Sequence, residues 1–424
     1  MSIFSLWLNE GFASYIEAIG GDFLEPEATI LDRFSLDNIF NTFDIDSLET
    51  SHPVSGTVQH PDEIREIFDD ISYGKGASII RMMSNFLGQE VFLEGVTLYL
   101  NRFEYQNAVQ DDLWQALTEV AHKEGAIDLS LTVKDIMDTW TLQVGYPVLQ
   151  VERNYEENKA TLTQKRFMPS KTDEENKAIK WWIPISYEFE NGQFDIKTTQ
   201  EWLSPEMDSF EIDLDNPDKA VVFNVQQTGY FRVNYDQKNW NLIINALESN
   251  PLSINRVNRG QILNDVFSLA KAGNPSYKTA LDTSRYLQDE IEYIPWKSGL
   301  KSFSYIELML QRSAIYGTYR SYLQSLMLYP YFELSDKPEN EMTINDLDLY
   351  SNVFEWLCKL GYDECLKRSK DMFKQWMDCE FPDAFNPIDV TIRGTVYCEA
   401  IAQGDETEWM FLNNRFVKMH QSYG

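Results

Sequence analysis

The sequence predicts a multidomain α+β protein with a helical N-terminal region, a small antiparallel β-sandwich and a C-terminal α-helical solenoid. Apolar residues repeat at helical spacing in residues 1–142, alternate one by one within residues 143–237, and return to helical spacing in residues 238–424. The length of 424 residues also suggests about three domains. We therefore predict domain boundaries at these changes of period.

In the N-terminal region, the clearest helix is expected over residues 76–87. Its apolar residues stand at i, i+1, i+4 and i+8, on one side of a helix: Ile79, Ile80, Met83 and Leu87. A second helix is expected over residues 133–140, because Gly145 and Pro147 follow it and such residues end helices.

In the middle region, a period of two residues predicts strands. The longest alternating run is Trp181, Ile183, Ile185, Tyr187 and Phe189. Two shorter runs are Val221, Phe223 and Val225, then Phe231, Val233 and Tyr235. Asn191-Gly192 is a turn signal, so we expect a hairpin between a strand at 181–190 and one at 194–196.

Helical spacing returns in the C-terminal region, for example over residues 259–270. Amphipathic helices joined by short polar links predict stacked helix pairs, as in a solenoid. We find no repeat at a fixed period, so this prediction depends on the helical patterning and on the resemblance described below.

The composition excludes several classes of partner. Lys and Arg number 36 and Asp and Glu 67, which gives a net charge of −31. That charge repels phosphate backbones and anionic lipid surfaces, so we expect no nucleic-acid partner. It leaves open a preference for cationic peptides. No run of 18 or more apolar residues occurs, so we expect no transmembrane segment.

Six sequence blocks point to a function. The first is Leu6-Trp7-Leu8-Asn9-Glu10-Gly11-Phe12-Ala13, on a predicted helix that carries one carboxylate, Glu10, in its first turns. The others, named by their end residues, are Ser72–Ser78, Trp140–Pro147, Thr228–Tyr235, Asn258–Ile262 and Arg393–Cys398. Together they closely resemble the gluzincin zinc aminopeptidases of the aminopeptidase N type. The resemblance runs through nearly the whole chain.

The resemblance implies a thermolysin-like helical catalytic subdomain, of which residues 1–142 would be a part. It implies zinc as cofactor, peptides as substrates, Glu10 as the third zinc ligand, and Tyr73 as a donor to the oxyanion formed during peptide hydrolysis. Taken alone, a Glu on a helix is usually a solvated charge and a Tyr a core or rim residue, so the motifs carry both assignments.

The other two zinc ligands and the general base of the family lie on a His-Glu-x-x-His helix. Counting back from Glu10, we expect that helix before Met1, and we expect the helical tail to continue past residue 424. The chain has four histidines, His52, His60, His122 and His420, and no two have the i, i+4 spacing that binds metal. We expect each to be structural or exposed.

The cysteines indicate in which cellular compartment the protein is expected. The resemblance implies a Cys358–Cys365 disulfide, hence an oxidising compartment, with the protein at the plasma membrane or outside the cell and any anchor upstream of Met1. A cytoplasmic protein with four buried thiols is the alternative. Cys379 and Cys398 could pair with each other or stay free.

The sequence leaves the activity of this chain open. The leading hypothesis is a zinc aminopeptidase that hydrolyses N-terminal residues from peptides when the full catalytic domain is present. The alternative is an inactive fragment or isoform that acts as a peptide or protein interaction module through its helical solenoid. A third possibility is a piece that folds poorly because it exposes apolar surface. Substrate preference and oligomeric state cannot be predicted.

Overall fold

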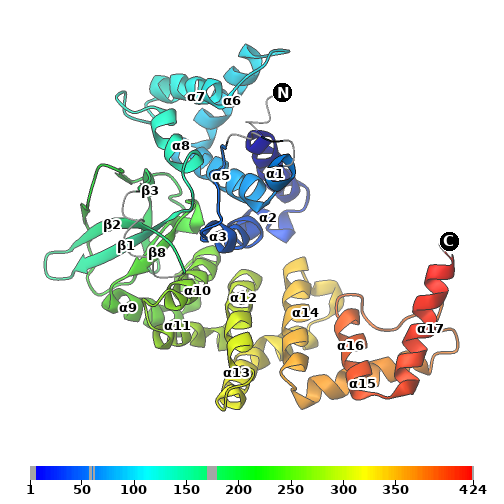
Figure 1. The fold of residues 1–424 in the computed structure, drawn as a ribbon. Helices are drawn as coiled ribbons and strands as arrows, with labels where there is room; N and C mark the ends of the chain where they lie inside the picture. The colour runs from blue at the N-terminus through cyan, green and yellow to red at the C-terminus, as the bar shows by residue number, and fades with distance from the viewer. Residues whose placement is uncertain (1–5, 57–59, 61–62, 170–178, 423–424) are drawn as a thin grey trace. The chain divides into compact units, whose positions relative to one another are not determined.

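The computed structural model describes residues 6–56, 60, 63–169 and 179–422. The chain forms two compact units, Met1–Tyr286 and Leu287–Gly424 (Figure 1). The three predicted domains, 1–142, 143–237 and 238–424, remain an interpretation. Strand β1 begins at Pro147 and helix α9 at Gln237, so the type of element changes near these positions.

The first unit begins with a run of helices. They are α1 (Leu6–Leu24), α2 (Ile30–Phe34), α3 (Phe40–Asp46), α4 (Glu63–Glu66), α5 (Gly76–Leu87), α6 (Gln89–Arg102), α7 (Gln110–Glu124) and α8 (Val133–Thr141). Short 3-10 or π turns join some of them: η2 (Pro26–Ala28), η3 (Ser35–Ile39) and η4 (Ile71–Lys75). The four apolar residues predicted on one side of α5 are all buried, and α1 lies against α5 (Figure 1).

Eight strands follow among the described residues of the same unit. They are β1 (Pro147–Asn154), β2 (Lys159–Arg166), β3 (Ile183–Ile185), β4 (Tyr187–Phe189), β5 (Glu201–Leu203), β6 (Phe210–Asp213), β7 (Val221–Phe223) and β8 (Arg232–Tyr235). One sheet has the order β6-β2-β1-β8, and two small sheets pair β3 with β5 and β4 with β7. All pairs are antiparallel except β1 and β8, which run parallel from the Val148–Arg232 pair to the Val151–Tyr235 pair.

Two strand predictions need correction. The expected strand over 181–190 is two strands interrupted at Ser186, and the halves pair with different partners. A turn does form at Asn191-Gly192, where the Gly192 N–H donates to the Phe189 carbonyl, but no strand forms at 194–196. Phe194 is instead buried with a φ of 54°, and its carbonyl accepts a hydrogen bond from the Gln226 side chain.

Helices α9 (Gln237–Ser249), α10 (Arg256–Lys271) and α11 (Tyr277–Ser284) complete the first unit. Two 3-10 turns also lie within it, η6 (Val225–Gln227) and η7 (Pro251–Ser253). The helix predicted over 259–270 lies within α10, and nearly all of its residues are buried.

The second unit is helical, as predicted for the C-terminal region. Its helices are α12 (Tyr293–Leu310), α13 (Tyr316–Asp336), α14 (Ile344–Lys359), α15 (Asp363–Met377), α16 (Arg393–Gln403) and α17 (Glu406–Ser422). It also contains the 3-10 turn η9 (Glu339–Glu341), and the 3-10 turn η8 (Arg285–Asp289) begins in the first unit and ends in the second. Helix α13 packs on α14 and α15 on α16. Among the described residues, none of the helices combines the length and apolar character that crossing a membrane would require.

The structure forms the disulfide implied by the resemblance. Cys358, at the end of α14, is bonded to Cys365, at the start of α15, with their Cα atoms 5.2 Å apart. Cys379 and Cys398 are free thiols, so the two do not pair with each other. The disulfide therefore closes the short turn between two helices of the second unit.

Candidate active site

The structure brings the two predicted site residues together. Glu10 lies on α1 and Tyr73 in η4, and both side chains are half-buried. Burial raises the pKa of Tyr73, and the neighbouring Glu10 carboxylate raises it further. A phenol with a raised pKa stays protonated at neutral pH, so the Tyr73 hydroxyl is available as a hydrogen-bond donor.

Two glycines allow this approach. A Cβ atom on Gly11 would lie 2.8 Å from the carbonyl carbon of Gly76, and one on Gly76 would lie 3.3 Å from the Gly11 Cα. The backbones of α1 and α5 are therefore in direct contact. Because Glu10 precedes Gly11 and Tyr73 lies just before Gly76, this contact sets the side chains of the two predicted site residues side by side.

A third glycine fixes η4 from another direction. A Cβ atom on Gly74 would lie 2.1 Å from the Thr42 hydroxyl oxygen of α3, which is closer than any side chain tolerates. The Thr42 hydroxyl donates a 2.6 Å hydrogen bond to the Asn38 carbonyl, so it is held in place. The turn that carries Tyr73 is thus packed against both α1 and α3.

An ion pair holds the start of η4. One Asp69 oxygen accepts hydrogen bonds from the Ile71 and Ser72 N–H groups, both at 3.1 Å, and the Asp69 carbonyl accepts from the Tyr73 N–H at 3.1 Å. The other Asp69 oxygen lies 2.9 Å from His52 Nε2. The hydrogen bond with Asp69 raises the pKa of His52 above 6.5 although burial opposes it.

The last residue of η4, Lys75, forms a fully buried ion pair with Asp46. Lys75 Nζ is 2.9 Å from Asp46 and donates at 2.8 Å to the Gly145 carbonyl. Asp46 also accepts from the Gly145 N–H at 3.0 Å, the Ser51 hydroxyl at 2.6 Å and the Tyr230 hydroxyl at 3.2 Å. Three of the sequence blocks, those around residues 75, 145 and 230, therefore meet at one carboxylate. Burial lowers the pKa of Lys75, and Asp46 opposes that effect.

A second buried pair joins the strands to α10. Arg232 lies 2.9 Å from Asp265 and donates to Asn264 at 2.6 Å and to the Tyr146 hydroxyl at 3.3 Å. The other Asp265 oxygen accepts from the Val233 N–H at 3.0 Å. Burial raises the pKa of Asp265 to about 6, and the Arg232 charge opposes this. The Thr228–Tyr235 block thus has a structural role that periodicity did not reveal, although a lone Arg between apolar strand residues is a usable signal.

The residues present do not complete a metal site. Within the part of the chain that the structure describes, no group of three His, Cys, Asp or Glu side chains could hold a metal ion. His52 is engaged with Asp69, and His122 Nε2 contacts the Leu131 carbonyl at 2.8 Å. His60 is exposed, and the side chain of His420 lies outside the described residues. A zinc ion needs about four ligands, and of the predicted set this chain supplies Glu10.

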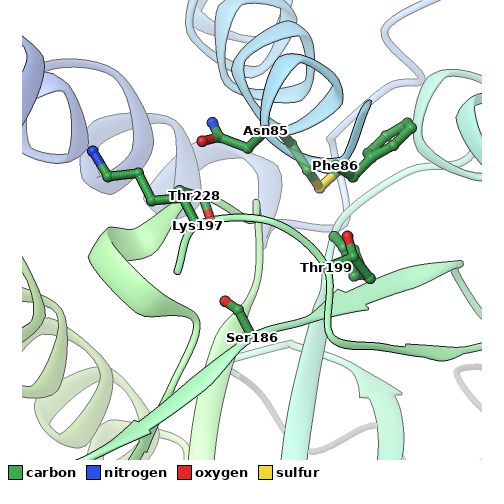
Figure 2. A pocket seen from close by; sticks show the side chains of 8 residues that line it. Asn85, Phe86, Ser186, Lys197, Thr199 and Thr228 are labelled. Carbon is green, nitrogen blue, oxygen red and sulfur yellow. The ribbon is translucent and has the colours of Figure 1, made fainter. Parts of the chain in front are cut away.

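One pocket lies between α5 and the strand region (Figure 2). It is lined by Met82, Asn85, Phe86, Pro184, Ser186, Lys197, Thr199 and Thr228. Figure 2 shows Asn85 and Phe86 of α5 on one side and Ser186 on the other. The cavity volume of this pocket is about 10 Å³, room for about one water molecule and far below the roughly 300–1,000 Å³ of ligand pockets, so we assign it no ligand.

Comparison with known proteins agrees with the motifs. Residues 2–140 match the Peptidase family M1 domain and residues 220–422 the ERAP1-like C-terminal domain. The chain is 39% identical to aminopeptidase N of Bos taurus over an alignment of 422 positions, which covers 97% of this chain and 43% of that protein. Identity is 38% over 422 residues to aminopeptidase N of Homo sapiens, covering 97% of this chain and 42% of that protein. The thyrotropin-releasing hormone-degrading ectoenzyme of Rattus norvegicus is 32% identical over 431 residues, covering 98% of this chain and 40% of that protein. The chain spans less than half the length of these relatives.

Proposed function

The chain belongs to peptidase family M1, as a zinc metalloaminopeptidase family member, and from this premise we propose that it forms one wall of an active site that removes N-terminal residues from peptides. The contact between Glu10 and Tyr73 carries this proposal, because it places two polar groups of the family motifs side by side. The aminopeptidase N relatives support peptides as the substrate class.

Tyr73 is proposed as the donor to the oxyanion. When water attacks a peptide carbonyl, negative charge develops on the carbonyl oxygen, and a donor fixed at about 2.7–3.1 Å stabilises that charge. The packing of η4 against α1 and α3 holds the phenol in place before substrate binds. The raised pKa of Tyr73 keeps the proton on the donor at neutral pH.

Glu10 is proposed as one zinc ligand, because a carboxylate oxygen is an accepted ligand of that metal. The described residues do not fit a complete zinc site, so we assign no reaction step to the metal. The remaining ligands and the general base must then come from residues other than those described. Without a positioned base, proton transfer is unassisted, a loss of about 10²–10⁴-fold.

We propose a location at the plasma membrane or outside the cell. The Cys358–Cys365 disulfide supports an oxidising compartment, because cytosolic thiols are kept reduced. Labelling of intact cells with a membrane-impermeant reagent, compared with labelling after lysis, tests this. Labelling seen only after lysis would favour the cytoplasmic alternative.

The activity is tested by joining this chain to the part of bovine aminopeptidase N that precedes the region it matches. We expect the joined protein to bind one zinc ion and to hydrolyse an amino-acyl nitroanilide, whereas the 424-residue chain alone does neither. Tyr73→Phe should lower kcat by about 10²–10³-fold with zinc retained. Glu10→Gln should reduce bound zinc, and Tyr105→Phe, at a fully exposed tyrosine, should change neither property.

Two results would contradict the proposal. Stoichiometric zinc and Tyr73-dependent turnover in the chain alone would show that its own residues complete the site. Unchanged turnover in a zinc-loaded Tyr73→Phe protein would remove the role of Tyr73. A joined protein that folds and binds zinc but has no turnover would favour the interaction-module alternative.

A further inference from the structure

We propose that His52, acting through Asp69, is a positioning residue for Tyr73, and that the protonation state of His52 controls how firmly the η4 turn is held. The inference deepens the proposed function and rests on it, because Tyr73 matters here as the oxyanion donor. It concerns a residue that lacks any place in the sequence motifs and would otherwise count as an ordinary structural histidine.

A continuous chain of contacts joins His52 to Tyr73. His52 Nε2 lies 2.9 Å from one Asp69 oxygen, and the other Asp69 oxygen accepts from the Ile71 and Ser72 N–H groups at 3.1 Å. The Asp69 carbonyl accepts from the Tyr73 N–H at 3.1 Å. Asp69 is therefore the residue that closes the first turn of η4, and His52 holds the Asp69 carboxylate from the opposite side.

The geometry around His52 requires a doubly protonated ring. Nδ1 lies 2.9 Å from the Pro53 carbonyl oxygen and Nε2 lies 2.9 Å from the Asp69 carboxylate. A carbonyl and an ionised carboxylate can only accept, so both ring nitrogens must donate. A neutral imidazole has a single N–H group, so it must give up one of the two contacts. The observed arrangement is thus that of the imidazolium.

Among the residues that the structure describes, two carboxylates act on His52. Asp69 is the nearest, and Asp46 acts from α3 at longer range, with its own charge balanced by the buried Lys75. The other side chains beside His52 in a small surface pocket carry no titratable group: Leu6, Trp7, Pro53, Val54, Ile67 and Ser72. The His52 side chain is 35% exposed and that of Asp69 31%, so protons can exchange with solvent.

The pH window follows from the directions of the two pKa values. The hydrogen bond with Asp69 raises the pKa of His52 above 6.5. Burial acts to raise the pKa of Asp69, but hydrogen bonds from His52 and Ser72 outweigh it and lower that pKa below 3.8. The charged pair is therefore intact between these two values. As the pH rises through the pKa of His52, the ring loses a proton and one contact, and the cap on η4 weakens.

Nuclear magnetic resonance of the full chain tests this without turnover. The protein is labelled with 15N in the histidine rings and in isoleucine amides. The histidine signals are assigned by His→Gln substitutions, and the Ile71 amide by Ile71→Val. We expect the Ile71 amide to shift with pH at the same midpoint as the His52 ring. Asp69→Asn should lower the His52 midpoint by about one unit or more, since it removes an adjacent charge.

The matched control is His122, whose Nε2 contacts the Leu131 backbone carbonyl at 2.8 Å. His52→Gln should abolish the pH-dependent shift of Ile71, whereas His122→Gln should leave it unchanged. The inference is overturned if the Ile71 amide signal does not shift at the titration midpoint of His52, or if it still shifts with pH in His52→Gln. Either result leaves the proposed role of Tyr73 untouched. If the coupling is present but Tyr73→Phe in the joined protein keeps full kcat, the proposed function fails instead.

Discussion

Lys75→Met tests whether the buried network around Lys75 and Asp46 stabilises the candidate site. The Lys75 and Asp46 side chains are both fully buried, and the substitution keeps the length and apolar stem of the side chain while it removes the ammonium group. Asp46 then loses its counterion but keeps three donors, from Ser51, Gly145 and Tyr230. Leaving one charge of a buried pair without its partner costs about 3–5 kcal/mol, so we expect a loss of that size in the free energy of unfolding of the first unit.

The assay is urea unfolding followed by hydrogen–deuterium exchange, read on peptides from residues 6–286, so that the loss is assigned to the first unit. Adding Asp46→Asn to Lys75→Met should recover at least about half of the loss, because the remaining side chain is neutral. Lys123→Met removes exposed ion pairs with Glu94 and Glu124 and should leave the free energy of unfolding nearly unchanged. A loss below about 1 kcal/mol for Lys75→Met would refute the reasoning.

Three further predictions concern packing, the disulfide and pH. Gly11→Ala should separate α1 from α5 and destabilise the first unit by up to about 2 kcal/mol, whereas Gly20→Ala, in open space on the same helix, should stabilise it by about 0.5–1 kcal/mol in thermal unfolding. Replacing Cys358 and Cys365 by Ser should lower the stability of the second unit by about 2–3 kcal/mol, and no change on adding reductant to the unsubstituted chain would contradict this. His52→Gln should destabilise the first unit by less than about 1 kcal/mol near pH 6. Its effect should be smaller well above the raised pKa of His52, where the ring has lost its charge and one contact, and a larger effect at high pH would contradict this pH dependence.

Periodicity predicted the kind of element well where one face is buried along its whole length. The α5 stripe is an example, since all four of its predicted apolar residues are buried. It did not predict the interruption at Ser186, because the period of two continues across the residue at which the chain passes from one small sheet to the other. The Asn191-Gly192 turn formed, but the strand after it did not, because Phe194 is held by Gln226 from a distant part of the chain.

Part of the candidate site could be predicted from the sequence. Glu10 and Tyr73 were found through family motifs, and their assigned roles stay a prediction. The contacts that position them were not found, because the Lys75–Asp46 and His52–Asp69 pairs join residues that only the fold brings together. The glycines of the motifs could have signalled close packing, and the Gly11–Gly76 contact is the physical reason for two of them.

The central claim is that Glu10 and Tyr73 belong to one site. Its most direct test is to measure the pKa of Tyr73 in the unsubstituted chain and in the Glu10→Gln variant. It is read from tyrosines labelled with 13C at the ring carbon that bears the hydroxyl, with Tyr73 assigned by Tyr73→Phe. We predict a pKa above 10.0 in the unsubstituted chain and a lower value in Glu10→Gln, with part of the shift retained because burial is its largest cause. Glu17→Gln, at an exposed residue of the same helix, should leave it unchanged. An identical Tyr73 pKa with and without the Glu10 carboxylate would contradict the account.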